Sequence, residues 1–170
     1  MSGTTELRIT YRKEASPKLV AYSDASYANN VDDRKSTSAY LFLKNGGAVS
    51  WRSKKQSIIA KSPMESEYIA LTDAVKEGQW LSHLEKSLRG KTDVITYYED
   101  NQSAIHTAKN PIHYDRSKHI DVRYHFIRDL VRKKEIEIVY LPTAEMIVNA
   151  LTKPIQRVLN DKLRAIMGLS

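Results

Sequence analysis

The chain has 170 residues, a formal net charge of +7 at pH 7 and no cysteine. The length fits one domain with a sizeable hydrophobic core, and the lack of cysteine excludes a disulfide framework and a thiolate metal site. No apolar run approaches the roughly 20 residues that span a bilayer, and the first residues lack the apolar core of a signal peptide. The positive charge favours a polyanionic partner such as nucleic acid, although a solvated basic surface alone would give the same composition.

The first half of the sequence predicts short strands followed by one long helix. Alternating or continuous apolar residues mark the strands, and the pair Gly46–Gly47 marks a hairpin turn. Apolar residues at helical spacing follow a Ser–Pro start signal, and Arg89–Gly90 ends that helix. The predicted elements are an edge strand at 7–11, strands at 19–22, 36–44 and 48–59, and a helix at 64–88.

The second half predicts two strands and four helical segments. An Asn–Pro pair ends the first of these segments, and Pro154 separates the last two. The predicted elements are strands at 94–98 and 137–141 and helical segments at 101–109, 119–134, 146–152 and 155–167. The chain shows no internal repeat and no low-complexity linker, so we predict one mixed α/β domain over residues 1–170.

Three acidic residues lie next to these predicted elements. Asp24 and Asp100 each follow a strand, and Glu67 lies near the start of the long helix. Carboxylates in one confined site cannot all stay ionised without a cation between them, and oxygen-only ligands suit Mg²⁺ or Mn²⁺. Two such ions about 4 Å apart would activate a water molecule and stabilise the leaving oxygen in phosphodiester hydrolysis. Each acid alone also fits a plainer role, as a loop acid, a helix N-terminal acid or an N-cap, and both interpretations stay open.

Seven segments of the chain occur in the order of the motifs of one known family. They are YSDASYA, DDRKSTSAYLF, AVSWRSKKQ, ESEYIAL, EDNQSAI, SKHIDVRYHFIRD and NALTKPI. In this order they resemble the ribonuclease H domain of copia-type LTR retrotransposon polyproteins, over roughly residues 4–156. The resemblance implies an α/β ribonuclease H-like fold, a five-stranded mixed sheet with its first three strands antiparallel and helices on both faces. Residues 157–170 would then form a C-terminal helical extension.

The resemblance also implies a function. It implies a metal-dependent endoribonuclease that hydrolyses the RNA strand of RNA–DNA hybrids during reverse transcription, with two Mg²⁺ ions that Mn²⁺ can replace. The implied partners are the hybrid and the reverse transcriptase domain of the same polyprotein, without a membrane. The implied location is intracellular, in a cytoplasmic virus-like particle or in the nucleus.

Four positions match the acidic motif of that family, as catalytic residues and metal ligands. Three of them are Asp24, Glu67 and Asp100; we choose Glu67 over Glu65 because Glu67 directly precedes Tyr-Ile-Ala-Leu. The fourth is Asn149, which stands where relatives carry an aspartate before the LTKP motif. An asparagine offers an oxygen but removes one negative charge, so we expect weaker binding of the second ion and impaired activity.

Two explanations of Asn149 stay open: a natural loss of activity and an engineered Asp→Asn change. The corresponding alternative function is a catalytically inactive module that binds the hybrid or packs against a reverse transcriptase. The presence of all three acids argues against a purely structural module, which would not need them.

Basic residues form the remaining candidate contacts. The segment 112–134 contains seven Lys or Arg and three His, which fits either a solvated amphipathic helix or a surface that grips phosphates. His119 is a candidate for proton transfer or product release, and equally for a structural hydrogen bond at a helix start. Trp51 and Trp80 are expected in the core rather than as base-stacking platforms. The candidate phosphate contacts are Lys54, Lys55, Lys61, Lys118, Arg123 and Lys153.

Overall fold

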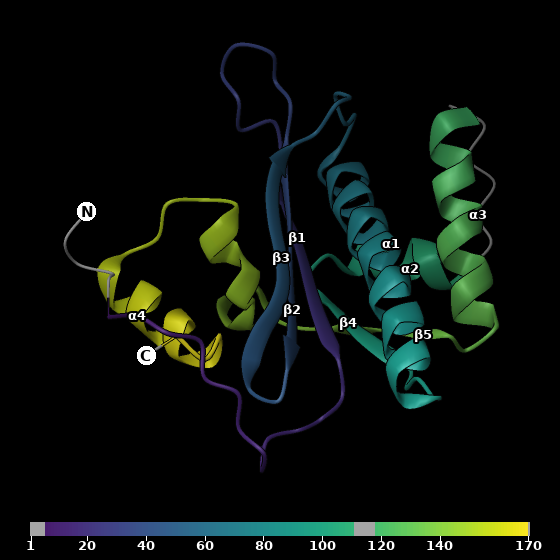
Figure 1. Ribbon diagram of the computed structural model, residues 1–170. Coiled ribbons are helices and arrows are strands. Elements are labelled where there is room, and N and C mark those ends of the chain that lie inside the picture. The colour runs from purple at the N-terminus through teal and green to yellow at the C-terminus, as the bar shows by residue number, and fades with distance from the viewer. Residues whose placement is uncertain (1–5, 111–117, 170) are drawn as a thin grey trace.

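A five-stranded mixed sheet lies at the centre of the fold in the computed structural model (Figure 1). The structure describes residues 6–110 and 118–169, with the backbone alone for 118–121. The strand order of the sheet is β3-β2-β1-β4-β5. β1 pairs antiparallel with β2 and β2 with β3, while β4 runs parallel to both β1 and β5. This confirms the predicted fold class. The strands are β1 Val20–Ser26, β2 Thr37–Lys44, β3 Gly47–Lys55, β4 Ile95–Glu99 and β5 Ile136–Tyr140.

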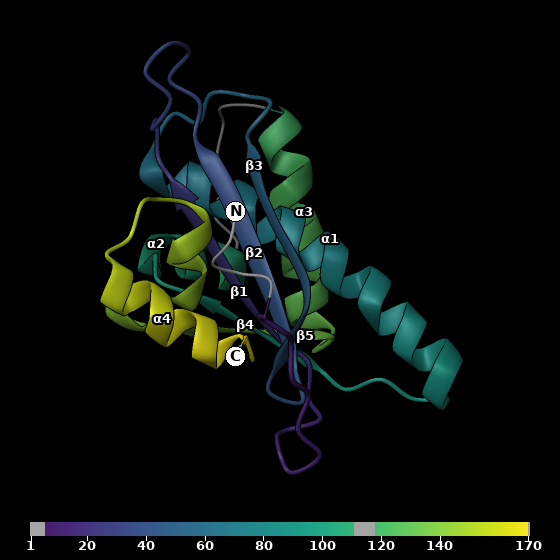
Figure 2. The ribbon, with the colours of Figure 1, turned by 60° about the vertical axis from the view of Figure 1, so that its left-hand side comes forward.

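Helices cover both faces of the sheet, and Figure 2 brings the α4 side forward. One face carries α1 Pro63–Arg89, α2 Gln102–Lys109 and α3 Lys118–Arg132. The other face carries the 3₁₀ turns η1 Thr143–Glu145 and η2 Ile147–Leu151 and the helix α4 Arg157–Ile166. None of the helices in the described ranges combines the length and apolar composition of a membrane-spanning segment.

The alternation of side chains along β2 builds a separate core on each face. Tyr40 and Phe42 pack with α1, α2 and α3, whereas Ala39 and Leu41 pack with η2 and α4. Successive residues of a strand point to opposite faces, so an almost continuously buried strand is required between two helical layers. The apolar run in β2 is the sequence signature of this position.

The ends of α1 are fixed by local chemistry that the sequence predicts. The Ser62 side chain caps the helix by accepting a hydrogen bond from the backbone N–H of Glu65 at 3.2 Å, and Pro63 is the first helical residue. Gly90 ends the helix with φ +72°, a left-handed conformation that glycine adopts without strain. The hairpin turn differs by one residue from the prediction. Asn45 and Gly46 have the positive φ values, of 53° and 75°, and Gly47 begins β3.

Four other expectations are wrong. The strand predicted at 48–59 ends at Lys55, and residues 56–59 belong to no strand. The predicted edge strand at 7–11 makes only an isolated bridge, between Ile9 and Leu169. Asp24 lies inside β1, paired with Ala39, because β1 continues past the apolar run to Ser26. Trp51 and Trp80 are 56% and 58% exposed instead of buried. Trp51 is exposed because β3 is an edge strand, which sequence periodicity does not reveal.

Candidate active site

Three carboxylates from three separate elements meet beside η1 and η2. Asp24 comes from β1, Glu67 from near the start of α1, and Asp100 from the residue after β4. One oxygen atom of each lies within 4.8 Å of those of the other two. Asp24 and Glu67 are buried and Asp100 is half-buried. The predicted convergence of these three acids is therefore present in the fold.

The two aspartates lie side by side because two tripeptides of the same pattern run in parallel. The pattern is Tyr-x-Asp, at Tyr22–Asp24 in β1 and at Tyr98–Asp100 along the end of β4. Tyr22 pairs with Tyr98 in the parallel register, and their rings stack with centroids 4.9 Å apart. Each of the two parallel segments carries its aspartate two residues after the tyrosine, on the same face of the sheet. Neighbouring strands lie only about 4.8 Å apart. The register of β1 and β4 thus brings the acids together.

Glu67 rather than Glu65 joins this cluster. Glu65 is turned toward the helix end, where its Oε2 accepts a hydrogen bond from the backbone N–H of Lys61 at 2.9 Å. This contact satisfies a free N–H group ahead of the helix, as an acid in the first turn commonly does. Glu67, two residues later, faces the sheet and is 7% exposed. The two glutamates therefore have different roles.

The electrostatics of the cluster disfavour three ionised acids. Burial, reinforced by the charges of Glu99, Asp24 and Asp100, raises the pKa of Glu67 to about 10. Burial also raises the pKa of Asp24, although a hydrogen bond from Thr152 and the charge of Lys153 oppose the rise. Desolvation and repulsion between like charges both favour the protonated form of an acid. A cation between the carboxylates would remove this penalty.

Asn149 lies on η2 and connects to the cluster through two threonines. Its Nδ2 donates a hydrogen bond to the carbonyl oxygen of Thr143 at 2.9 Å, and Thr143 Oγ1 donates to Asp100 Oδ2 at 2.7 Å. On the other side, Thr152 Oγ1 donates to Asp24 Oδ2. Asn149 is 7% exposed, and its Oδ1 is buried with no hydrogen-bond partner among the described residues. The predicted fourth position is therefore linked to both aspartates through the two threonines.

Known relatives of this sequence are parts of transposon polyproteins. It is 40% identical over 153 residues to the retrovirus-related Pol polyprotein from transposon TNT 1-94 of Nicotiana tabacum, which covers 90% of this chain and 12% of that protein. It is 33% identical over 171 residues to the Pol polyprotein from transposon RE1 of Arabidopsis thaliana, covering 100% of this chain and 12% of the polyprotein. The chain thus spans about an eighth of the length of these curated relatives. No protein-family model matches the sequence.

Several solved structures with a similar fold are ribonucleases H. The N-terminal RNase H domain of a Mycobacterium tuberculosis protein superposes with a TM-score of 0.60 at 11% identity, covering 89% of this chain and 96% of that one. LC11-RNase H1, in complex with an RNA/DNA hybrid, superposes with a TM-score of 0.56 at 12% identity, covering 79% and 93%. The chain is a Pol polyprotein homologue with the ribonuclease H fold. The resemblance inferred from the seven motifs is confirmed.

A fourth carboxylate of this ribonuclease H domain, Glu99, was not predicted from the sequence. Glu99 is fully buried behind the aspartates, and burial raises its pKa well above the ordinary range. Ser23 Oγ donates to Glu99 Oε2 at 2.9 Å, and the backbone N–H of Asn101 donates to Oε1 at 3.2 Å. Glu99 thereby ties β1 to the chain that follows β4. The central positions of the two Tyr-x-Asp tripeptides, Ser23 and Glu99, were the available signal.

Thr143 and Thr152 were also missed, although Thr152 belongs to the LTKP motif. Their hydroxyl groups are the hydrogen-bond donors to Asp100 and Asp24 described above. Hydroxyl donors of this kind fix the orientation of a carboxylate. Nothing in the spacing of Thr143 pointed to such a contact.

The candidate phosphate contacts of the domain have different surroundings. Lys54, Lys61 and Lys153 are exposed, and the charge of Lys153 acts on Asp24. Lys55 forms an ion pair with Asp33 at 3.0 Å. The other two candidates stand on α3: Arg123 is half-buried, and the side chain of Lys118 lies outside the described residues. The side chain of His119, the candidate for proton transfer or product release, also lies outside them.

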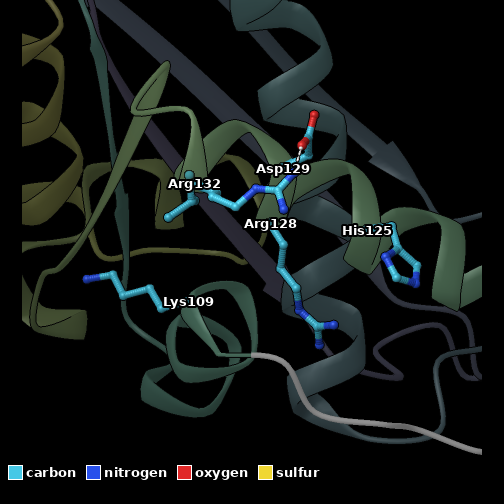
Figure 3. A pocket seen from close by; sticks show the side chains of 6 residues that line it. Lys109, His125, Arg128, Asp129 and Arg132 are labelled. Atoms are coloured by element: carbon cyan, nitrogen blue, oxygen red, sulfur yellow. Dashed lines mark hydrogen bonds and ion pairs between the residues drawn. The ribbon is translucent and has the colours of Figure 1, made fainter.

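A cavity of about 630 Å³ lies apart from the acidic cluster, between α2 and α3 (Figure 3). Arg128 Nε donates to the carbonyl oxygen of Thr107 at 3.0 Å, and Arg132 pairs with Asp129 at 2.8 Å. None of the three cluster acids lines this cavity, so it is not the candidate active site. Its lining residues are Lys109, His125, Arg128, Asp129, Val131 and Arg132.

Proposed function

We propose that this chain is a ribonuclease H that hydrolyses the RNA strand of RNA–DNA hybrids with the help of Mg²⁺, or of Mn²⁺ in its place. The observation that carries the proposal is the convergence of Asp24, Glu67 and Asp100 from three elements, with oxygen atoms within 4.8 Å of one another. The ribonuclease H fold and the Pol polyprotein relatives support it. A similar structure is described in complex with an RNA/DNA hybrid, which supports the same substrate class here.

The donor atoms of the site fit two hard divalent cations. All of the candidate ligand atoms are oxygens, which Mg²⁺ and Mn²⁺ prefer. Glu67 Oε2 and Asn149 Oδ1 are both buried without a hydrogen-bond partner among the described residues, so both are available. Bound there, divalent cations would activate the attacking water and stabilise the leaving oxygen. Asp24, Glu67, Asp100 and Asn149 would hold them.

The residues around the acids prepare the site for this role. The hydroxyl groups of Thr152 and Thr143 hold the carboxylates of Asp24 and Asp100 in one orientation, which lowers the cost of ordering them during the reaction. Lys153 places a positive charge near Asp24, where a phosphate of the RNA strand would lie. His119, on the first turn of α3, is proposed to assist proton transfer or product release.

Asn149 is proposed to lower the rate of hydrolysis. It offers a neutral oxygen where an aspartate would offer a negative charge, so a second ion would be held less tightly and would stabilise charge on the leaving oxygen less well. Each 1.36 kcal/mol lost in the transition state lowers the rate tenfold. Hybrid binding should survive, because most of its affinity comes from phosphate contacts elsewhere. The reverse transcriptase part of a Pol polyprotein is the proposed protein partner, since the relatives are such polyproteins.

Cleavage of an end-labelled RNA–DNA hybrid tests the proposal. With Mg²⁺ or Mn²⁺ this chain should cut the RNA strand but not a DNA duplex, and EDTA should stop the reaction. Asp24→Asn should abolish cleavage, whereas Asp161→Asn, on the exposed part of α4, serves as a matched control. Asn149→Asp should raise turnover and leave the dissociation constant of the hybrid within a few-fold.

One result would contradict the proposal that this chain is an enzyme. If this chain and its Asn149→Asp variant both bind the hybrid and neither cleaves it, the chain is a hybrid-binding module instead. Binding that weakens as salt rises would then still show that phosphates are recognised.

A further inference from the structure

Asn149 makes contacts that an aspartate could not make. The Thr143 carbonyl oxygen only accepts hydrogen bonds, so the group that faces it at 2.9 Å must be the Nδ2 of Asn149. This fixes the orientation of the amide and turns Oδ1 into the buried interior, where it has no partner among the described residues. An ionised aspartate has no donor, and its second oxygen would face the carbonyl oxygen of Thr143 with a repulsive contact.

Among the described residues, the Asn149 amide is one of a few contacts that hold η1, together with its own backbone hydrogen bonds and the Thr143 hydroxyl on Asp100. η1 consists of three residues, none of them buried, and no side chain caps its start. Within the described part of the chain, its backbone hydrogen bonds include Glu145 N–H to Pro142 at 2.8 Å and Met146 N–H to Thr143 at 3.2 Å. Short 3₁₀ turns have poor hydrogen-bond geometry and open easily. The amide of Asn149 therefore supplies a contact from the buried η2 to the exposed η1.

Asn149 is linked to both aspartates of the acidic cluster, to Asp100 through Thr143 and to Asp24 through Thr152. Thr143, whose carbonyl Asn149 holds, donates its hydroxyl to Asp100. The backbone carbonyl of Asn149 accepts from the N–H of Thr152 at 3.2 Å and lies 3.3 Å from Thr152 Oγ1, whose hydroxyl donates to Asp24. One residue thus contacts both threonines that orient the aspartates.

We propose that Asn149 is a positioning residue, whose side-chain amide clamps η1 so that the Thr143 hydroxyl stays on Asp100. Compared with an aspartate, the asparagine lacks one negative charge at the candidate metal site. It gains a hydrogen bond from its side-chain amide to the carbonyl oxygen of Thr143 in η1. The clamp belongs to the fold itself, while its effect on catalysis rests on the proposed function. Asn149→Asp would restore the charge and break the clamp in one step.

Hydrogen exchange tests the clamp without any need for activity. In the unmodified chain with EDTA, the Nδ2 protons of Asn149 should exchange at least about tenfold more slowly than those of an exposed asparagine such as Asn160, since a buried hydrogen bond contributes roughly 1.4 kcal/mol. Asn149→Asp should speed exchange of the Met146 backbone N–H by a similar factor and leave the β2 amides unchanged. Fast Nδ2 exchange, or an unaltered Met146 rate in the variant, would overturn the proposal.

Kinetics separate positioning from a purely structural role. Thr143→Val removes the hydroxyl that the clamp positions, while Thr143→Ser keeps it and should behave as the unmodified chain. Asn149→Asp should therefore raise kcat severalfold more in the Thr143→Val background, where no positioned hydroxyl remains to be lost, with KM for the hybrid unchanged. An equal gain in both backgrounds would contradict the clamp. If no variant cleaves hybrids while Asn149 Nδ2 exchange is slow, the clamp stands and the proposed function fails.

Discussion

Replacing Glu67 with glutamine should stabilise the protein in the absence of metal. Burial and three neighbouring carboxylates raise the pKa of Glu67 from 4.5 to about 10. Between these values the folded chain holds a proton on Glu67 that the unfolded chain releases. The free energy of unfolding therefore falls as pH rises through this window, and the full stability is present only below about pH 4.5. A neutral glutamine of similar size does not titrate, so the penalty disappears.

The size of the effect follows from the same shift. The 2.5 pH units between 4.5 and 7, at 1.36 kcal/mol each, set an upper limit of about 3 kcal/mol at pH 7. Glu99 carries part of the same repulsion, so we expect about 1–3 kcal/mol. At about 2–4 °C per kcal/mol for a chain of this size, Tm should rise by roughly 2–12 °C. The gain should grow further at pH 8.5 and shrink toward pH 5.

Urea and thermal unfolding with EDTA at pH 5, 7 and 8.5 measure this gain. Glu65→Gln is the matched control, because Glu65 lies in the same part of α1 but outside the cluster. It should give no gain that increases with pH. Adding Mg²⁺ should stabilise the unmodified chain and have less effect on Glu67→Gln, since a ligand that binds the folded state stabilises it. A gain that is absent, or the same at all three pH values, would refute the reasoning.

Two further substitutions test other parts of the structure. Gly78→Ala should lower the free energy of unfolding, measured in urea, by about 1–3 kcal/mol, because a Cβ at Gly78 would collide with the buried hydroxyl of Tyr97. Adding Tyr97→Phe should recover part of the loss. A Gly78→Ala variant with an unchanged free energy of unfolding would contradict this packing. Thr152→Val should raise the pKa of Asp24 further, because it removes a hydrogen bond that lowers this pKa. Mg²⁺ should therefore stabilise the variant only at a higher pH than it stabilises the unmodified chain or the Thr152→Ser control. An unchanged pH dependence of the Mg²⁺ stabilisation would show that the hydroxyl is unimportant.

Local chemistry in the sequence was enough to predict most of the elements. Ser62 and Gly90 mark the ends of α1 by their own capping preferences, and the apolar run in β2 reflects a strand covered on both faces. These signals depend on neighbours within a few residues. Gly78, which weakens a helix by propensity, has a tertiary explanation instead, because it makes room for Tyr97.

The parts that could not be predicted depend on contacts between distant segments. β1 continues through Asp24 to Ser26 because β2 pairs with it, although its apolar run has ended. The position of β3 at the sheet edge leaves Trp51 exposed, and no periodicity encodes an edge. The hydrogen bond between Ser23 and Glu99 spans 76 positions. Such pairs become visible only when the strand register is known.

The distribution of donors around the acids indicates where a cation would matter most. Asp24 receives a hydroxyl from Thr152 and feels the charge of Lys153, and Asp100 receives a hydroxyl from Thr143. Glu67 Oε2 has no donor among the described residues. Only the backbone N–H of Ala25 opposes the rise of the Glu67 pKa, whereas burial and the charges of Glu99, Asp24 and Asp100 raise it to about 10. A cation bound at the cluster would therefore relieve Glu67 more than the aspartates, and Glu67→Gln should weaken Mg²⁺ binding while it stabilises the metal-free fold.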